Sequence, residues 1–83
     1  VVVAVNHAVA VAMAQGPTVG LALLRRIEGA DDFYPYHAAR ADLLRRTNQV
    51  EAAADAYEQA IALCSNSVER AYLQRRLDEM LGR

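Results

Sequence analysis

Residues 50–64, VEAAADAYEQAIALC, decide the fold. Apolar side chains recur in this stretch at intervals of three and four residues, and charged or amide side chains occupy the other positions. This spacing follows the 3.6-residue turn of an α-helix rather than the two-residue alternation of a strand. It therefore predicts an amphipathic helix that buries one face. The apolar positions are Val50, Ala53, Ala54, Tyr57, Ala60, Ile61 and Cys64.

The segment just upstream predicts a partner for this helix. Residues 38–46 place Ala41, Leu43 and Leu44 among charged side chains, as expected of a second amphipathic helix. Residues 47–49, Thr-Asn-Gln, interrupt both patterns over a length that suits a tight turn between two helices. The two segments therefore predict an antiparallel helix hairpin.

A further helix is predicted after Cys64. The sequence Ser-Asn-Ser at residues 65–67 is rich in capping side chains, and Asn66 with Glu69 three residues later fits a capping-box-like start. The helix is expected to run to about Leu81, with Gly82 as its stop. Its apolar stripe consists of Leu73, Leu77, Met80 and Leu81, with Tyr72 beside it.

The first third of the chain predicts another hairpin. Gly16 and Pro17 separate two apolar segments, and Pro17 suits the first position of a helix because its missing N–H would be unpaired there. The second helix is expected over residues 17–28, with Gly29 ending it and Leu21, Leu24 and Ile27 on its inner face. Residues 29–36 are predicted to form the loop between the two hairpins.

Residues 2–14 are the most ambiguous segment. Large and small apolar residues alternate over residues 8–14, a pattern that also fits a strand. A helix is favoured because alanine is a strong helix former, because the segment is long for a strand, and because no second strand exists to pair with it. The sequence thus predicts an all-α fold of about five helices, arranged as antiparallel helix hairpins.

Composition narrows the class of protein. The 83 residues fit a single domain, residues 1–83, and 54% of them are apolar. Nine basic and ten acidic side chains give a formal charge of -1, which disfavours nucleic-acid binding across the whole chain. The lone Cys64 favours a reducing compartment, so a cytoplasmic location is expected. The initial apolar run is too short to span a bilayer, and the first residue, Val1, suggests a piece of a longer protein.

The second predicted hairpin resembles the tetratricopeptide repeat, a helical hairpin of about 34 residues. Small residues are expected where its helices approach closely, and large ones fill the space between them. The first hairpin is a weaker copy, and the last helix would cap the stack. The matching positions are Ala41, Leu44, Ala53, Tyr57 and Ala60 in the second hairpin and Val9, Gly20, Leu24 and Ile27 in the first. The predicted core comprises Leu24, Ala41, Leu44, Ala53, Tyr57, Ala60, Leu73 and Leu77.

A more specific resemblance covers nearly the whole chain. It is to the C-terminal, tetratricopeptide-like extension of bacterial extracytoplasmic-function (ECF) RNA polymerase sigma factors. The chain departs from that pattern at His7, where Arg is expected, and at Asn48, where Gly is expected. The similar segments are VVAVNHAVAV at residues 2–11, Gly16, Pro17, Gly20 and Leu21, YHAARADLLRR at residues 36–46, and Glu69, Arg70, Leu73, Arg75, Arg76 and Leu77.

This resemblance implies a regulatory protein-interaction domain without catalytic activity or a cofactor. The implied partner is RNA polymerase or the sigma factor's own upstream domains, and only those upstream domains would contact DNA. No membrane partner is expected. The alternative is a general helical-repeat adaptor that binds a peptide in a groove lined by the inner faces of its helices.

Three arginine pairs are candidates for partner binding. Residues 25–26, 45–46 and 75–76 each fall in the later part of a predicted helix, where cations suit the negative end of the helix dipole. Asp42 precedes Arg46 by four residues and can pair with it. Alternatively, the pairs form a basic face that docks on an acidic partner. The candidate partner-binding residues are Arg45, Arg46, Arg75, Arg76, Tyr34 and Tyr36, the two tyrosines serving either as exposed anchors or as filling between the hairpins.

The nucleophilic and metal-ligating side chains are few. His7 and His37 are the only imidazoles and lie in different predicted helices, so neither favours a metal site. Cys64 lies on the apolar stripe of its helix, where a thiol is usually an inert part of the core. The sequence therefore predicts neither a metal centre nor a catalytic site.

Overall fold

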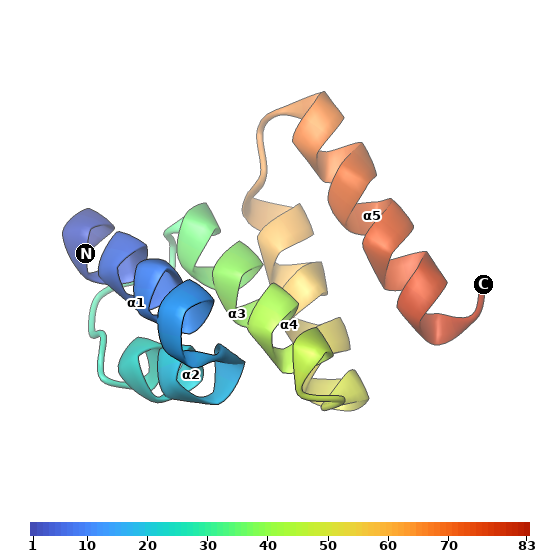
Figure 1. Ribbon diagram of the computed structural model, residues 1–83. Coiled ribbons are helices and arrows are strands. Elements are labelled where there is room, and N and C mark those ends of the chain that lie inside the picture. Colours follow the sequence, from blue (N-terminus) through green and yellow to red (C-terminus); the bar gives the residue numbers. More distant parts are fainter.

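The computed structural model describes residues 1–83 as five α-helices without a strand (Figure 1). The all-α prediction is therefore confirmed, and the ambiguous first segment is a helix. None of the five helices has both the length and the apolar character needed to cross a lipid bilayer. The helices are α1 (Val2–Gln15), α2 (Pro17–Arg25), α3 (Tyr34–Arg46), α4 (Val50–Leu63) and α5 (Ser67–Leu81).

The helices pack as two antiparallel hairpins followed by a single helix. α1 packs on α2 and α3 packs on α4, while contacts between α2 and α3 join the two hairpins. α5 packs mainly on α4, at the end of the molecule opposite α1 (Figure 1). This order is the stacking expected of a short tetratricopeptide-like array.

Two tight turns close the hairpins. Gly16, with φ 103°, ends α1, and Pro17 begins α2 directly after it. Asn48, with φ 61°, lies in the left-handed region between α3 and α4, which explains why Gly is expected there and why Asn is tolerated. The hydroxyl of Thr47 donates to the carbonyl oxygens of Leu43 and Leu44 at 3.1 and 3.0 Å and satisfies the end of α3.

Two predicted boundaries were wrong. α2 ends at Arg25 rather than at Glu28, because the next two N–H groups bond to carbonyl oxygens three residues back and tighten the last turn. α3 begins at Tyr34, so the loop predicted over residues 29–36 is shorter. Pro35 does not prevent this, because the first turn of a helix needs no N–H from it.

All eight residues of the predicted core are buried, each at most 4% exposed. Val50 and Leu81 were expected on buried faces but are 42% and 40% exposed. They are the first residue of α4 and the last of α5, so each lies at the end of its helix. The core also takes in small residues of the seams, namely Ala8, Ala12 and Ala56.

His37 ties the loop between the hairpins to α3. Its ring is buried, and its Nε2 lies 2.8 Å from the carbonyl oxygen of Asp31. A protonated Nε2 would donate to this oxygen, which leaves Nδ1 as the unprotonated nitrogen without a partner. His37 therefore has a structural role, because it adds a side-chain contact to the few backbone hydrogen bonds of this loop.

Asn66 is the side-chain cap of α5. Its Oδ1 accepts from the N–H groups of Val68 and Glu69 at 2.9 and 3.0 Å, whereas the Asn66 N–H does not donate to the Glu69 carboxylate in return. Asn66→Ala is expected to lower the free energy of unfolding by about 1 kcal/mol because two N–H groups lose their acceptor. Urea denaturation monitored by circular dichroism measures the loss. Asn66→Ser keeps a capping oxygen and should recover most of it, and a midpoint unchanged in Asn66→Ala would contradict the cap.

Candidate functional site

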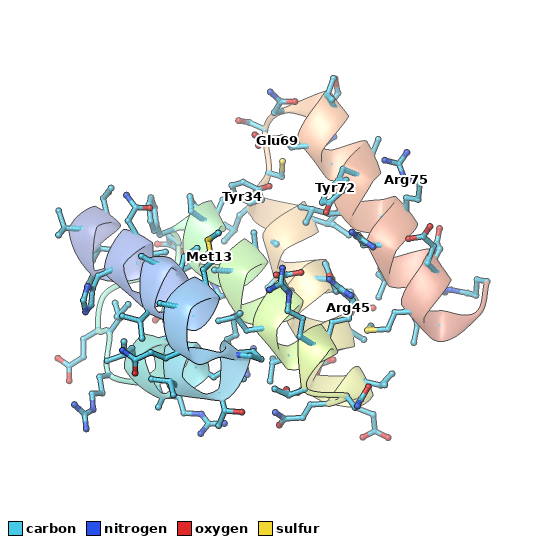
Figure 2. All side chains as sticks on the ribbon, viewed as in Figure 1. Met13, Tyr34, Arg45, Glu69, Tyr72 and Arg75 are labelled. Carbon is cyan, nitrogen blue, oxygen red and sulfur yellow. The ribbon has the colours of Figure 1, made fainter.

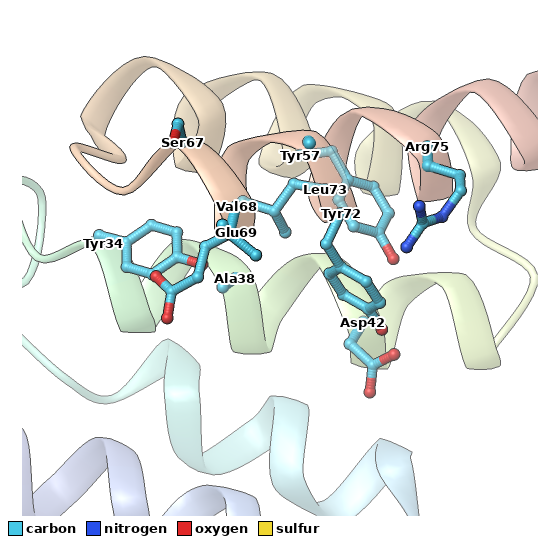
Figure 3. Close-up of a pocket in the computed structure, with 11 residues that line it drawn as sticks. Tyr34, Ala38, Asp42, Tyr57, Ser67, Val68, Glu69, Tyr72, Leu73 and Arg75 are labelled. Atoms are coloured by element: carbon cyan, nitrogen blue, oxygen red, sulfur yellow. The ribbon is translucent and has the colours of Figure 1, made fainter.

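An open groove of about 780 Å³ lies between α3 and α5, with α4 beneath it (Figure 3). Two buried side chains, Tyr57 and Leu73, form part of its floor together with Ala38. Most of the lining is apolar, and the charged side chains belong to α3 and α5. The residues that line it are Tyr34, Ala38, Asp42, Tyr57, Ser67, Val68, Glu69, Ala71, Tyr72, Leu73 and Arg75.

Helix periodicity explains why these side chains face one another. Tyr34, Ala38 and Asp42 are four residues apart and therefore form one stripe along α3. On α5 most residues from Ser67 to Arg75 line the groove, and Val68, Ala71, Tyr72 and Arg75 among them recur at intervals of three and four. The groove is thus the space between two helix stripes.

One end of the groove is formed by Tyr34 and Glu69 (Figure 3). Burial, together with the nearby Glu69 carboxylate and the Cys64 thiol, raises the pKa of Tyr34 from 10.0 to about 12. The neutral phenol is therefore strongly favoured at this end. Glu69 itself is exposed and takes part in no ion pair, and its carboxylate lies next to the Tyr34 hydroxyl.

The raised pKa of Tyr34 predicts a loss of stability in alkali. The folded state holds the phenol proton until about pH 12, whereas the unfolded chain releases it near pH 10. The stabilisation is therefore complete below pH 10 and is lost as the pH rises through 12. Urea midpoints measured across this window should fall less steeply for Tyr34→Phe, which cannot ionise. Equal slopes for the two proteins would contradict the placement of Tyr34.

The other end of the groove carries Tyr72 and two arginines. The guanidinium carbons of Arg75 and Arg76 lie 5.8 and 5.6 Å from the centre of the Tyr72 ring. Arg76 also donates from Nε to the Tyr72 hydroxyl at 3.2 Å. Cation–π contacts of this kind limit the motion of exposed arginines. Tyr72 is 46% exposed and Arg75 is also exposed, so these two side chains form an accessible aromatic and basic surface (Figure 2).

Asp42 lies beside Tyr72 at this same end of the groove, but its charge is already paired (Figure 3). Its Oδ1 accepts a hydrogen bond from Arg45 at 2.7 Å, and its Oδ2 forms an ion pair with Arg46 at 3.1 Å. The pairing with Arg46 was predicted from the sequence. Arg45 also donates from Nε to the Tyr57 hydroxyl at 3.2 Å, which links the paired charges to the groove floor. Burial raises the pKa of Tyr57, so its hydroxyl stays neutral.

The structure brings two of the three arginine pairs together. Arg75 lines the groove, whereas Arg45 and Arg76 line a neighbouring hollow of about 390 Å³. Arg46 is exposed beside Asp42. The pair at residues 25–26 lies at the end of α2 and lines neither hollow.

Two sequence interpretations need correction or refinement. The pair at residues 75–76 lies in the middle of α5 and not in its last turn, so the helix dipole does not explain it. Of the two candidate tyrosines, only Tyr34 lines the groove. Tyr36 packs edge-on against His37, with ring centres 5.1 Å apart, and is half-buried.

Tyr72 and Glu69 line the groove but were not among the candidate site residues predicted from the sequence. The signal for Tyr72 was present, because it precedes Arg75 and Arg76 by three and four residues and such pairs share a helix face. Glu69 was interpreted only as part of a helix cap.

The imidazoles and the thiol lie apart from one another. His7 is exposed on α1, whereas His37 is buried in α3. Cys64 is buried, and its thiol donates to the carbonyl oxygen of Asn66 at 3.3 Å. No three His, Cys, Asp or Glu side chains are grouped closely enough to hold a metal ion.

Comparison with known proteins finds no matching family model and no matching solved structure. An uncharacterized protein of Rhizobium meliloti (strain 1021) is 36% identical to this chain over 80 residues. The similar region covers 95% of this chain and 19% of that protein. The chain therefore spans about a fifth of the length of this curated relative.

Proposed function

We propose that this chain is a regulatory protein-interaction domain of an ECF-type RNA polymerase sigma factor. The groove between α3 and α5 is the observation that carries the proposal. It offers a partner an apolar floor with an exposed tyrosine and arginines at its edge, and these residue types are enriched among the strongest contacts of protein interfaces.

The residues behind the resemblance to sigma-factor extensions are also residues that build the groove. Residues 36–46 make up most of α3, one wall, and Glu69, Leu73 and Arg75 belong to α5, the other wall. A partner surface used by such an extension would therefore fall on this groove. In this function the domain docks on the sigma factor's own upstream domains or on polymerase in the cytoplasm, and it modulates transcription initiation. Contacts with DNA belong to the upstream domains.

A second candidate is a general helical-repeat adaptor that binds a peptide or protein unrelated to transcription. The groove favours it as well, because it is lined by the inner faces of α3 and α5. The partner's identity separates the two functions.

Transcription with purified components tests the sigma-factor function. The full-length protein that carries this chain is combined with core RNA polymerase, and transcript yield is measured together with affinity for polymerase. The double variant Tyr72→Ala, Arg75→Ala removes two exposed groove side chains and leaves the core intact. We expect it to weaken docking about tenfold and to change the transcript yield.

The matched control is Arg25→Ala, Arg26→Ala, which changes exposed arginines away from the groove. It should leave both measurements unchanged. If the full-length protein neither binds polymerase nor alters transcription, the sigma-factor function is overturned and the adaptor function replaces it.

A further inference from the structure

The two ends of the groove carry opposite charges that have no ion-pair partner. Glu69 and Arg75 are both exposed, and neither takes part in an ion pair. Asp42 lies beside Tyr72 at the Arg75 end, with its two oxygens paired with Arg45 and Arg46 (Figure 3). The groove therefore presents one free negative charge beside Tyr34 and one free positive charge beside Tyr72 (Figure 3).

The spacing of these two residues along the axis of α5 follows from helix geometry. Glu69 and Arg75 are six residues apart on α5, and a rise of 1.5 Å per residue separates them by about 9 Å along the helix. Ala38 and Leu73 line the groove as apolar surface. An extended peptide advances about 3.3 Å per residue and points alternate side chains to the same face, so side chains four positions apart, roughly 13 Å, can reach the two charges from one face.

We propose that the groove binds an amphipathic peptide segment of a partner protein, in which a large apolar side chain lies between one basic and one acidic side chain. The basic side chain faces Glu69 and the acidic side chain faces Arg75. This ligand rests on the proposed function and specifies the chemistry of its partner. A peptide without charges would remove Glu69 and Arg75 from water without pairing them, and this desolvation costs free energy. A peptide of a single charge sign would be repelled at one end.

Tyr72 contributes to this recognition by holding Arg75 in place. The cation–π contact at 5.8 Å reduces the freedom that the arginine loses when it binds a carboxylate. At the opposite end, the neutral Tyr34 hydroxyl lies beside the Glu69 carboxylate and adds no second charge there.

Four fluorescein-labelled peptides test the proposal by fluorescence polarisation with the full-length protein. All four share an apolar centre of Leu and Phe. They carry Lys and Glu, two Lys, two Glu, or two Gln, four positions apart, so that both side chains share one face with the apolar residue midway between them. We expect the Lys and Glu peptide to bind about fivefold more tightly than each of the others at low salt, and the advantage should shrink at high salt. Equal affinity of all four peptides, or binding of none, would overturn the proposal.

Charge reversal in the groove makes the test sharper. Arg75→Glu leaves two negative charges, so the peptide with two Lys should become the tightest ligand. Glu69→Lys leaves two positive charges, so the peptide with two Glu should become the tightest. The matched controls Arg25→Glu and Glu58→Lys reverse exposed charges on α2 and α4 that do not line the groove, and they should keep the original order. An unchanged order in both groove variants places the peptides elsewhere and overturns the proposal.

Peptide binding and transcription test the ligand chemistry and the sigma-factor function separately. If the four peptides do not follow the expected order while Tyr72→Ala, Arg75→Ala still alters transcription, the ligand chemistry is wrong and the sigma-factor function stands. If the peptides follow the order and transcription is unaffected, the ligand chemistry stands and the sigma-factor function is wrong.

Discussion

Tyr57→Ala is expected to lower the free energy of unfolding by about 3 to 5 kcal/mol. The ring is 2% exposed, packs in the core and also supports the groove floor. Its removal leaves a cavity between packed helices. Closing that cavity would cost other core contacts. A domain of this size has a total stability of roughly 4 to 12 kcal/mol, so the change removes a large part of it. Urea denaturation gives the loss directly.

Tyr57→Phe separates the ring from its hydroxyl. The hydroxyl accepts a 3.2 Å bond from Arg45, and its loss should cost only about 1 kcal/mol. If Tyr57→Ala shifts the midpoint no further than Tyr57→Phe does, the ring does not support the helix pair.

Gly20→Val is expected to destabilise the protein by about 3 kcal/mol through overpacking between α1 and α2. A Cβ atom at Gly20 would lie 2.5 Å from the Cβ of Ala12 and 3.1 Å from the carbonyl oxygen of Ala8. The second contact is with backbone, which cannot rotate away. The first hairpin would therefore have to separate, with loss of its packed seam. The midpoint of thermal or urea unfolding measures the effect.

The control for Gly20 lies on the same helix. Ala22 is exposed, so Ala22→Val adds similar bulk and should cost only about 0.5 kcal/mol of helix propensity. Gly20→Ala is a stricter test, because alanine at an exposed helix position stabilises by about 1 kcal/mol relative to glycine. Stabilisation by Gly20→Ala would contradict the close approach of the two helices.

The helices of the second half could be predicted from sequence because their signals are local. The period of Ala53, Tyr57 and Ala60 and the cap at Asn66 act within one or two turns. The prediction was wrong where one residue fits two structures. Pro35 suits a loop and also the first turn of a helix, and the structure uses it in the second way.

The groove could not be predicted because it depends on how α5 is placed relative to α3. Tyr34 and Glu69 are far apart in the chain, and no local pattern indicates that they share one end of a groove. The grouping of the arginine pairs could not be predicted from the sequence either. Sequence identified Arg45 and Arg76 as candidates, but only the packing of α5 puts them in one hollow.

Because α5 packs mainly on α4, the α5 side of the groove is held less firmly than the α3 side. The wall made by α3 is fixed by α2 and α4 on its other sides, whereas α5 is retained chiefly by the burial of Leu73 and Leu77. Those two side chains contribute a few kcal/mol, so the last helix can lift away while both hairpins stay folded. A peptide bound between α3 and α5 would hold α5 in place. Partner binding should therefore reduce the mobility of α5.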